Sequence, residues 1–167
     1  MSAIRQATAG QAEAVAALVE RAYARWVPVI GRRPAPMDDD YAARCAAGQV
    51  FCAMDGDALA GLVVIADAPD HLWLDNLAVD PAWQGRGIGS ALLAFVEAEA
   101  ACRGLPEVRL CTNQRMGANI ALYARKSYAE AARQEEDGFR RVYMAKQVAA
   151  RDAMRQHGGG RFAGAPP

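Results

Sequence analysis

Three glycines at alternate positions, Gly85, Gly87 and Gly89, lie within the segment VDPAWQGRGIGSALL of residues 79–93. Glycine allows successive backbone N–H groups to turn inward around an anion. The apolar run that follows is typical of a helix, whose unpaired N-terminal amides and positive dipole end attract the same kind of ligand. A plain turn needs fewer glycines and no polar anchor such as Gln84. The spacing therefore predicts a phosphate- or pyrophosphate-binding loop.

Two commoner phosphate motifs do not fit this segment. A P-loop requires Lys and then Ser or Thr after its last glycine, whereas Ser90 directly follows Gly89. A dinucleotide fingerprint read from Gly85 needs its third glycine at the position of Ser90, and it belongs in the turn after a first strand. The pattern that remains is Q/R-x-x-G-x-G/A, formed by Gln84, Gly87 and Gly89.

Two segments in this order resemble the GNAT N-acetyltransferase superfamily. LDNLAVDPAWQGRGIGSALL resembles its acetyl-CoA-binding motif, and NIALYARKSY resembles the segment that follows that motif in the family. The opening IRQATAGQAEAV is similar to the family's first strand and helix, so the resemblance covers residues 3–147 in element order. It implies transfer of an acetyl group from acetyl-CoA to a primary amine, by direct attack in a ternary complex and without a metal.

The resemblance also implies roles for individual residues. Leu77, Ala78 and Val79 would end a strand that splays from its neighbour and would contact the pantetheine arm through their backbone. Asn119 would hydrogen-bond the pantetheine, and Tyr123 has the position of the family's usual general acid, facing the thiol. The residues implied to hold the pyrophosphate are Gln84, Gly85, Arg86, Gly87, Ile88, Gly89 and Ser90.

The family's K-x-G-F pattern appears here as KSY, with Ser127 in place of the glycine. Glycine is the usual left-handed residue after a helix C-terminus. The substitution therefore predicts a differently shaped helix exit, without a left-handed residue.

The chemistry needs a base and a donor to the leaving sulfur. An amine with a pKa of about 10.4 is neutral in only about one molecule in a thousand or fewer at pH 7, so a carboxylate must take its proton, directly or through water. Asp75 is the candidate, with capping of nearby backbone amides as its alternative role; Asn76 is expected on the opposite face of the strand. Proton transfer from Tyr123 to a thiolate is uphill by about 2 kcal/mol, so Tyr123 is expected to act largely as a hydrogen-bond donor.

The acceptor site is less defined by sequence. Tyr23, Trp26, Trp73 and Tyr143, together with the loop IGRRPAP, are candidates to line it, and an aromatic pocket with few charges suits a small amine. Packing within a helix is the alternative role of Tyr23 and Trp26. A protein lysine or N-terminal acetyltransferase, and a non-catalytic acyl-CoA-binding module, remain open as functions.

Periodicity and turn signals predict the order β-α-α-β-β-β-α-β-α-β-β, which indicates a mixed sheet with helices on both faces. With the resemblance, the expected fold class is α/β (α+β), a mostly antiparallel six- to seven-stranded sheet with a central splay. The capping box TAGQ begins the first helix. The predicted strands cover residues 3–7, 49–54, 58–68, 71–79, 107–112 and the two halves of 128–148, and the predicted helices cover 11–26, 38–48, 90–104 and 117–127.

Composition narrows the class of protein further. The 167 residues predict one domain over 1–148 and a flexible Gly/Pro-rich tail over 149–167. Lys plus Arg equals Asp plus Glu at 19 each, which argues against nucleic acid and membrane surfaces as partners. The four cysteines form no CxxC pair, so no metal site is expected. With no signal-like or membrane-spanning run, the expected location is the cytoplasm, and a homodimer is left open.

Overall fold

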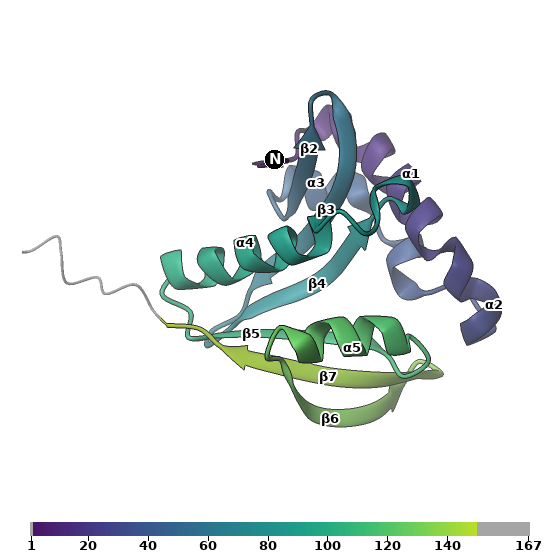
Figure 1. The fold of residues 1–167 in the computed structure, drawn as a ribbon, viewed down its shortest axis with the longest axis vertical. Helices are drawn as coiled ribbons and strands as arrows, with labels where there is room; N and C mark the ends of the chain where they lie inside the picture. The colour runs from purple at the N-terminus through teal and green to yellow at the C-terminus, as the bar shows by residue number, and fades with distance from the viewer. Residues whose placement is uncertain (1, 150–167) are drawn as a thin grey trace, which may run out of the picture.

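The computed structural model describes residues 2–149, and the predicted tail lies outside this part except for its first residue. A seven-stranded sheet in the order β1-β2-β3-β4-β5-β7-β6 carries helices on both faces (Figure 1). The strands are β1 (Ala3–Gln6), β2 (Val50–Asp55), β3 (Ala58–Asp67), β4 (Leu72–Val79), β5 (Glu107–Asn113), β6 (Ala129–Glu136) and β7 (Phe139–Gln147). The α-helices are α1 (Ala12–Tyr23), α2 (Val27–Ile30), α3 (Tyr41–Ala46), α4 (Ile88–Cys102) and α5 (Gly117–Arg125). Short 3-10 turns are η1 (Ala9–Gln11), η2 (Ala24–Trp26), η3 (Ala35–Asp38) and η4 (Pro81–Trp83).

The centre of the sheet is splayed. β4 and β5 are parallel and pair only where Leu72–Leu74 faces Val108–Leu110, whereas the other neighbouring strands are antiparallel. Beyond that point the two strands run apart, with α4 over one half of the sheet and α5 over the other (Figure 1). The mixed, mostly antiparallel sheet with a central splay is therefore confirmed. The backbone of residues 75–79 has no partner strand on its β5 side in the described chain.

A β-bulge in β4 places two polar residues on one face. Asn76 and Leu74 pair with consecutive residues of β3, so Asp75 is the extra residue. Asp75 accepts a hydrogen bond from Arg44 and Asn76 donates one to Tyr41, both of α3. The expectation that Asp75 and Asn76 point to opposite faces was wrong, because the bulge interrupts the alternation of side chains.

Two buried clusters cover the two faces of the sheet. The cluster beneath α4 and α5 includes Val63, Ile65, Leu72, Leu74, Leu92, Leu93, Val96, Val108, Leu110 and Tyr123. The cluster beneath α1 and α3 includes Val15, Leu18, Val19, Tyr23, Tyr41, Val50, Leu62 and Val64. The alternation of β3 residues between these clusters explains the unbroken apolar run LVVI, which was predicted to be covered on both faces.

The ends of the helices differ from the predictions by up to three residues, and two of these ends have a clear physical cause. The capping box is present, with the Thr8 amide donating to Gln11 Oε1 at 2.9 Å. However, α1 ends at Tyr23 rather than residue 26, and Pro28 lies in the first turn of α2, where a missing N–H costs nothing. After α5, Ser127 adopts φ +70°, so the left-handed exit exists without glycine and that expectation was wrong.

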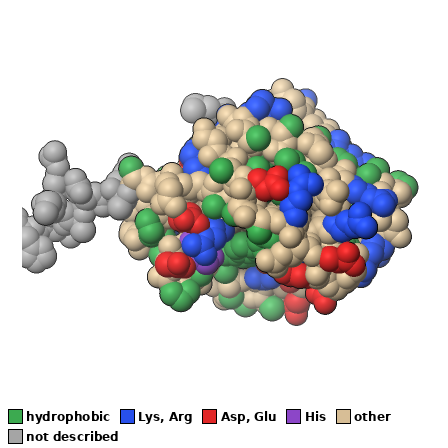
Figure 2. All heavy atoms as spheres, turned by 90° about the horizontal axis from the view of Figure 1, so that it is seen from below, with side chains coloured by type: hydrophobic (Ala, Val, Ile, Leu, Met, Phe, Trp, Pro, Cys, Tyr) green, Lys and Arg blue, Asp and Glu red, His purple; other side chains and the backbone are tan. Residues whose placement is uncertain are grey.

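Charge is balanced locally as well as overall. Ion pairs such as Arg133–Glu130 and Arg141–Glu136 lie along the β6–β7 hairpin. Figure 2, which views the molecule from below, shows acidic and basic side chains intermingled on that face. None of the helices within residues 2–149 is long and apolar enough to cross a membrane.

Candidate active site

The glycine loop has the backbone that the sequence predicts. Gly85 and Gly87 adopt φ +78° and +79°, and a Cβ placed on either would meet nothing within 4 Å. Conformation rather than space therefore requires glycine at these positions. Gly87 is the N-cap of α4, and the first bond within the helix joins the Ala91 amide to its carbonyl. The amides of residues 88–90 consequently have no partner within the helix.

The remaining residues of the glycine loop have separate roles. Gly89 lies within α4, and its Cβ position is 3.8 Å from two apolar side chains, an ordinary contact distance. Gln84 Nε2 donates to the Val79 carbonyl at 3.5 Å, which joins the loop to the end of β4. The Arg86 guanidinium lies 4.8 Å from the Trp83 ring centroid, in a cation–π contact on the surface of the loop.

A cavity of about 330 Å³ opens beside this loop, and we call it the loop cavity. The first turn of α4 contains no acidic residue that would repel an anion there. All the residues predicted to contact the cofactor line this cavity, with the exception of Arg86. Its lining includes Tyr23, Trp26, Leu77, Ala78, Val79, Gln84, Gly85, Gly87, Ile88, Gly89, Ser90, Met116, Asn119, Leu122 and Tyr123.

A second cavity, of about 380 Å³, lies between α1, η3, α3 and the strands of the splay, and we call it the inner cavity. Its lining includes Tyr23, Ile30, Pro34, Ala35, Pro36, Asp38, Asp39, Arg44, Asp75, Asn76, Leu77, Cys111, Asn113, Met116, Asn119, Tyr123, Phe139 and Arg141. The two cavities adjoin at five residues that line both, namely Tyr23, Leu77, Met116, Asn119 and Tyr123.

Tyr123 lies at this junction. Its side chain is buried against Tyr128, with ring centroids 5.9 Å apart, yet its hydroxyl makes no hydrogen bond to any residue of 2–149. Burial, and to a smaller extent the nearby Cys111, raises the pKa of Tyr123 above its usual value. The hydroxyl therefore remains protonated and is available to donate a hydrogen bond. Asn119, one turn earlier on α5, also has a side-chain amide with no partner in the described chain.

Asp75 is held by side chains at the wall of the inner cavity. Its carboxylate accepts hydrogen bonds from Arg44 Nη2 at 2.5 Å and Trp73 Nε1 at 3.2 Å, and it is 31% exposed. Arg44 also binds Asp39 at 3.0 Å, so two carboxylates share one guanidinium. The partners of Asp75 are thus side chains rather than the backbone amides considered above. The cluster keeps one excess negative charge beside the cavity.

The four aromatic residues predicted to line the acceptor site divide into two groups. Tyr23 lines both cavities, and its hydroxyl donates to Asn76 Oδ1 at 2.6 Å, while burial raises its pKa. Trp26 lines the loop cavity. Trp73 and Tyr143 pack against each other with centroids 6.3 Å apart, and neither is among the residues that line the two cavities.

Sequence reasoning missed several residues of the inner cavity. Cys111 lies on β5, whose alternate residues Val108, Leu110 and Thr112 are buried, and this alternation is the signal that would have placed it on the other face. Burial raises the pKa of the Cys111 thiol. No local pattern in the sequence indicated a role for Arg44, because it lies 31 positions before Asp75 in the chain.

Comparison with known proteins places this geometry in a family. The model of the acetyltransferase (GNAT) family matches residues 15–128, more than half of the chain. A search of curated proteins found no significant match.

Solved structures share the fold at low sequence identity. The PaiA N-acetyltransferase from Thermoplasma acidophilum, in complex with coenzyme A, is 15% identical with a TM-score of 0.75, over 89% of this chain and 99% of that one. The ribosomal-protein-S18-alanine N-acetyltransferase from Escherichia coli is 23% identical with a TM-score of 0.70, over 92% and 99%. A GCN5-related N-acetyltransferase from Rhodopseudomonas palustris is 22% identical with a TM-score of 0.74, over 89% and 96%. The chain belongs to the GNAT acetyltransferase family.

Proposed function

We propose that the protein transfers an acetyl group from acetyl-CoA to the primary amine of a small molecule. The observation that carries the proposal is the junction of two cavities at the unpartnered hydroxyl of Tyr123. The loop cavity is bordered by the glycine loop, which suits an anion. The inner cavity is bordered by the carboxylate of Asp75, which suits a positively charged amine. This arrangement lets two substrates meet end to end, as a ternary-complex reaction requires.

The loop cavity fits the cofactor in shape and charge. Left-handed Gly85 and Gly87 turn the loop backbone, and the free amides at the start of α4 form a site for a pyrophosphate. Asn119, with an unpartnered amide, suits the amide groups of a pantetheine arm. Bound acetyl-CoA supplies an activated thioester.

The chain supplies three functions around the reacting atoms. Asp75 takes a proton from the amine, directly or through water. Those backbone amides of residues 75–79 that point to the β5 side, where no strand pairs with them, are placed to polarise the thioester carbonyl. Tyr123 donates a hydrogen bond to the departing sulfur, because its raised pKa makes full proton transfer more costly than a hydrogen bond.

Two alternatives have different expected outcomes. The Escherichia coli neighbour is named for a ribosomal-protein alanine as its substrate, which keeps a protein acceptor as the second candidate. A non-catalytic acyl-CoA-binding module would bind the cofactor and transfer nothing.

Thermal unfolding with CoA, acetyl-CoA, ATP and NAD tests the donor. A ligand at 100 times its Kd stabilises the folded state by about 2.7 kcal/mol, a readily measured rise in Tm. We expect this rise with the two CoA species. A rise with ATP or NAD and none with CoA would contradict the proposal. Release of the CoA thiol across a panel of amines, with mass analysis of the products, then tests acetyl transfer itself.

A further inference from the structure

The segment 27–38, which contains α2 and η3, forms one wall of the inner cavity, and we call it the strap. It contributes Ile30, Pro34, Ala35, Pro36 and Asp38 to the lining of that cavity. The opposite wall comes from β5 and β7 on the other side of the splay. What holds these two walls together therefore determines how the inner cavity opens.

Two arginines connect the strap to the opposite half of the sheet. Arg32 Nη1 donates to the Asp137 carbonyl at 2.8 Å, and its guanidinium lies 3.9 Å from the Phe139 ring centroid. Arg115 Nη1, from the loop between β5 and α5, donates to the Val29 carbonyl at 3.0 Å. These contacts join residues 105 and 86 positions apart in sequence, so they bridge the two halves of the fold.

The β6–β7 turn leaves space for Arg32. Asp137 and Gly138 both adopt left-handed conformations, with φ +52° and +77°. A Cβ built on Gly138 would lie 2.7 Å from Arg32 Nη1, closer than real contacts allow. The absence of a side chain at this position therefore permits the close approach of the guanidinium.

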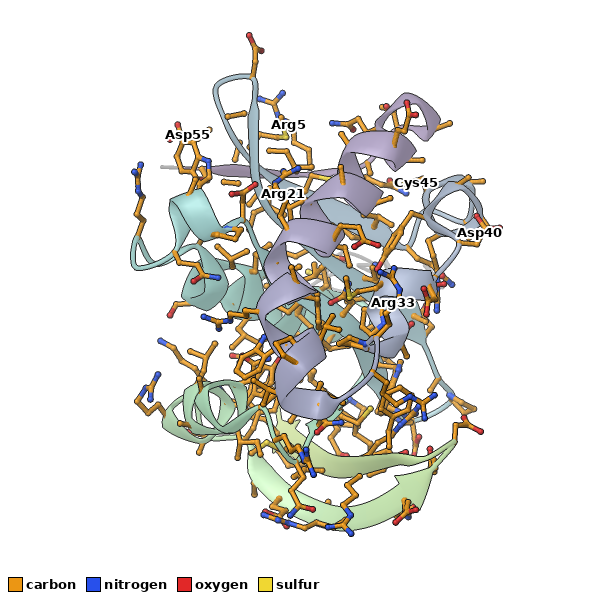
Figure 3. All side chains as sticks on the ribbon, turned by 90° about the vertical axis from the view of Figure 1, so that its right-hand side faces the viewer. Arg5, Arg21, Arg33, Asp40, Cys45 and Asp55 are labelled. Atoms are coloured by element: carbon orange, nitrogen blue, oxygen red, sulfur yellow. The ribbon has the colours of Figure 1, made fainter. Side chains whose placement is uncertain are left out.

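The strap is also held from its other side. Arg33 binds Glu20 of α1, and its ion pair with Asp38, at 3.0 Å, lies within the strap itself. Figure 3 shows Arg33 beside α1, on the side of the molecule that also carries the labelled Asp40. Arg32 and Arg33 thus tie the strap in opposite directions, to the turn of one half-sheet and to the helix that covers the other.

We propose that Arg32 and Arg115 latch the strap across the splay and so restrict the acceptor to a small free amine. In this proposal a polypeptide acceptor would enter between the strap and the β6–β7 turn, where the contacts of Arg32 lie. The volume of the inner cavity, about 380 Å³, is within the range of sites that bind single small molecules. The identity of the ligand as an acceptor rests on the proposed function, whereas the latching of the strap does not.

Cys111 reports on access to the inner cavity without any catalysis, because it lines that cavity. We would label the Cys102→Ser protein, which lacks the exposed cysteine, with a small methanethiosulfonate and with a maleimide on a polyethylene glycol chain. Peptide mapping then gives the ratio of the two rates at Cys111. Both reagents react with the thiolate, so the raised pKa of Cys111 slows both reactions by the same factor. The ratio of the bulky to the small reagent's rate therefore does not depend on that pKa.

The variants are Arg32→Ala, Arg115→Ala and their combination, with Arg140→Ala as the control. Arg140 lies on the same hairpin and is 69% exposed, with its nearest carboxylate at 4.0 Å. We expect the bulky-to-small ratio to rise at least tenfold in the double variant and to stay unchanged in the control. Equal ratios in the wild type and the double variant would overturn the latch.

Acceptor selectivity tests the second half of the proposal. The wild-type protein should acetylate small free amines at least 100-fold faster than a lysine or an N-terminus in a ten-residue peptide. In the double variant the ratio of the amine rate to the peptide rate should fall at least tenfold, and the KM for acetyl-CoA should stay unchanged. Equal wild-type rates on amines and peptides would overturn the latch and leave the proposed function standing. No transfer to any amine would overturn the proposed function, while the labelling ratio would still test whether the latch limits access to the inner cavity.

Discussion

Replacing Tyr123 with Phe removes a single hydroxyl from the junction of the two cavities. The ring remains packed against Tyr128, so the change leaves the apolar contacts of α5 in place. The lost hydroxyl has no hydrogen-bond partner in the described chain, and its removal therefore leaves no buried group unsatisfied. The variant should fold with nearly wild-type stability, and any loss of rate then reports on the reaction.

The size of that loss follows from the state of the hydroxyl. A tyrosine at its usual pKa of about 10 already transfers its proton to a thiolate uphill, and burial raises the pKa of Tyr123 further. A hydrogen bond to a charged partner contributes about 1.5–3 kcal/mol, so kcat should fall about 10- to 100-fold with an unchanged KM for acetyl-CoA. Because the raised pKa keeps the neutral form at higher pH, ionisation of Tyr123 should cause no loss of activity below about pH 10.

The assay is release of the CoA thiol under saturating acetyl-CoA, with Tyr128→Phe as the control. Tyr128 is also buried, and its hydroxyl donates to Glu97 at 3.3 Å rather than facing either cavity. The control should keep its kcat even if its stability falls. An unchanged kcat for Tyr123→Phe would refute a role for this hydroxyl, and a loss above about 1,000-fold would show that it transfers a full proton.

Three further substitutions separate binding, proton transfer and stability. Gly87→Ala forces a non-glycine residue into a left-handed conformation at a cost of about 1–2 kcal/mol and should raise the KM for acetyl-CoA about tenfold, whereas Gly104→Ala, at φ +70° in equally open space, should lower Tm and leave KM unchanged. Asp75→Asn should lower kcat about 100-fold or more. Asp39→Asn, which alters the other carboxylate bound to Arg44, should lower kcat far less. Equal losses in the two variants would show that Asp75 has a structural role only. Burial alone would raise the pKa of Asp80, but hydrogen bonds from the Ala82 amide and the Arg21 guanidinium lower this pKa overall. The ionised carboxylate therefore stabilises the fold at pH values above the ordinary aspartate pKa of about 3.9, and this stabilisation is lost as the pH falls below that value. Urea unfolding of Asp80→Asn should therefore show a loss of about 1 kcal/mol at pH 7 that shrinks towards pH 3, and a constant loss would contradict this assignment.

Local patterns predicted the parts of the site that are contiguous in sequence. The glycine loop, the start of α4 and the Asn119–Tyr123 spacing each depend on neighbours within one turn, and their residues surround one cavity. The order of elements along the chain followed from their alternation, and the splay followed from the resemblance, whereas the order of strands within the sheet was not predicted. Backbone conformation at a glycine is fixed locally, which explains why the shape of the loop could be predicted, while the binding roles of these residues stay predictions.

Contacts between distant segments were not predictable in the same way. The bulge at Asp75 depends on how β4 pairs with β3, and no local signal marks it. The sharing of Arg44 by Asp39 and Asp75 depends on where α3 packs. The left-handed Ser127 shows that tertiary packing can impose a conformation that a residue's own preference disfavours.

The central claim is that acetyl-CoA and an amine meet at the junction of the two cavities. A single-turnover experiment tests it most directly, with enzyme in excess of acetyl-CoA and with the free CoA thiol and the acetylated amine measured over time. Direct attack predicts that both products appear together, in equal amounts, at a rate that depends on the amine. Release of CoA without an amine, or an acetylated enzyme that forms before the product, would contradict the account.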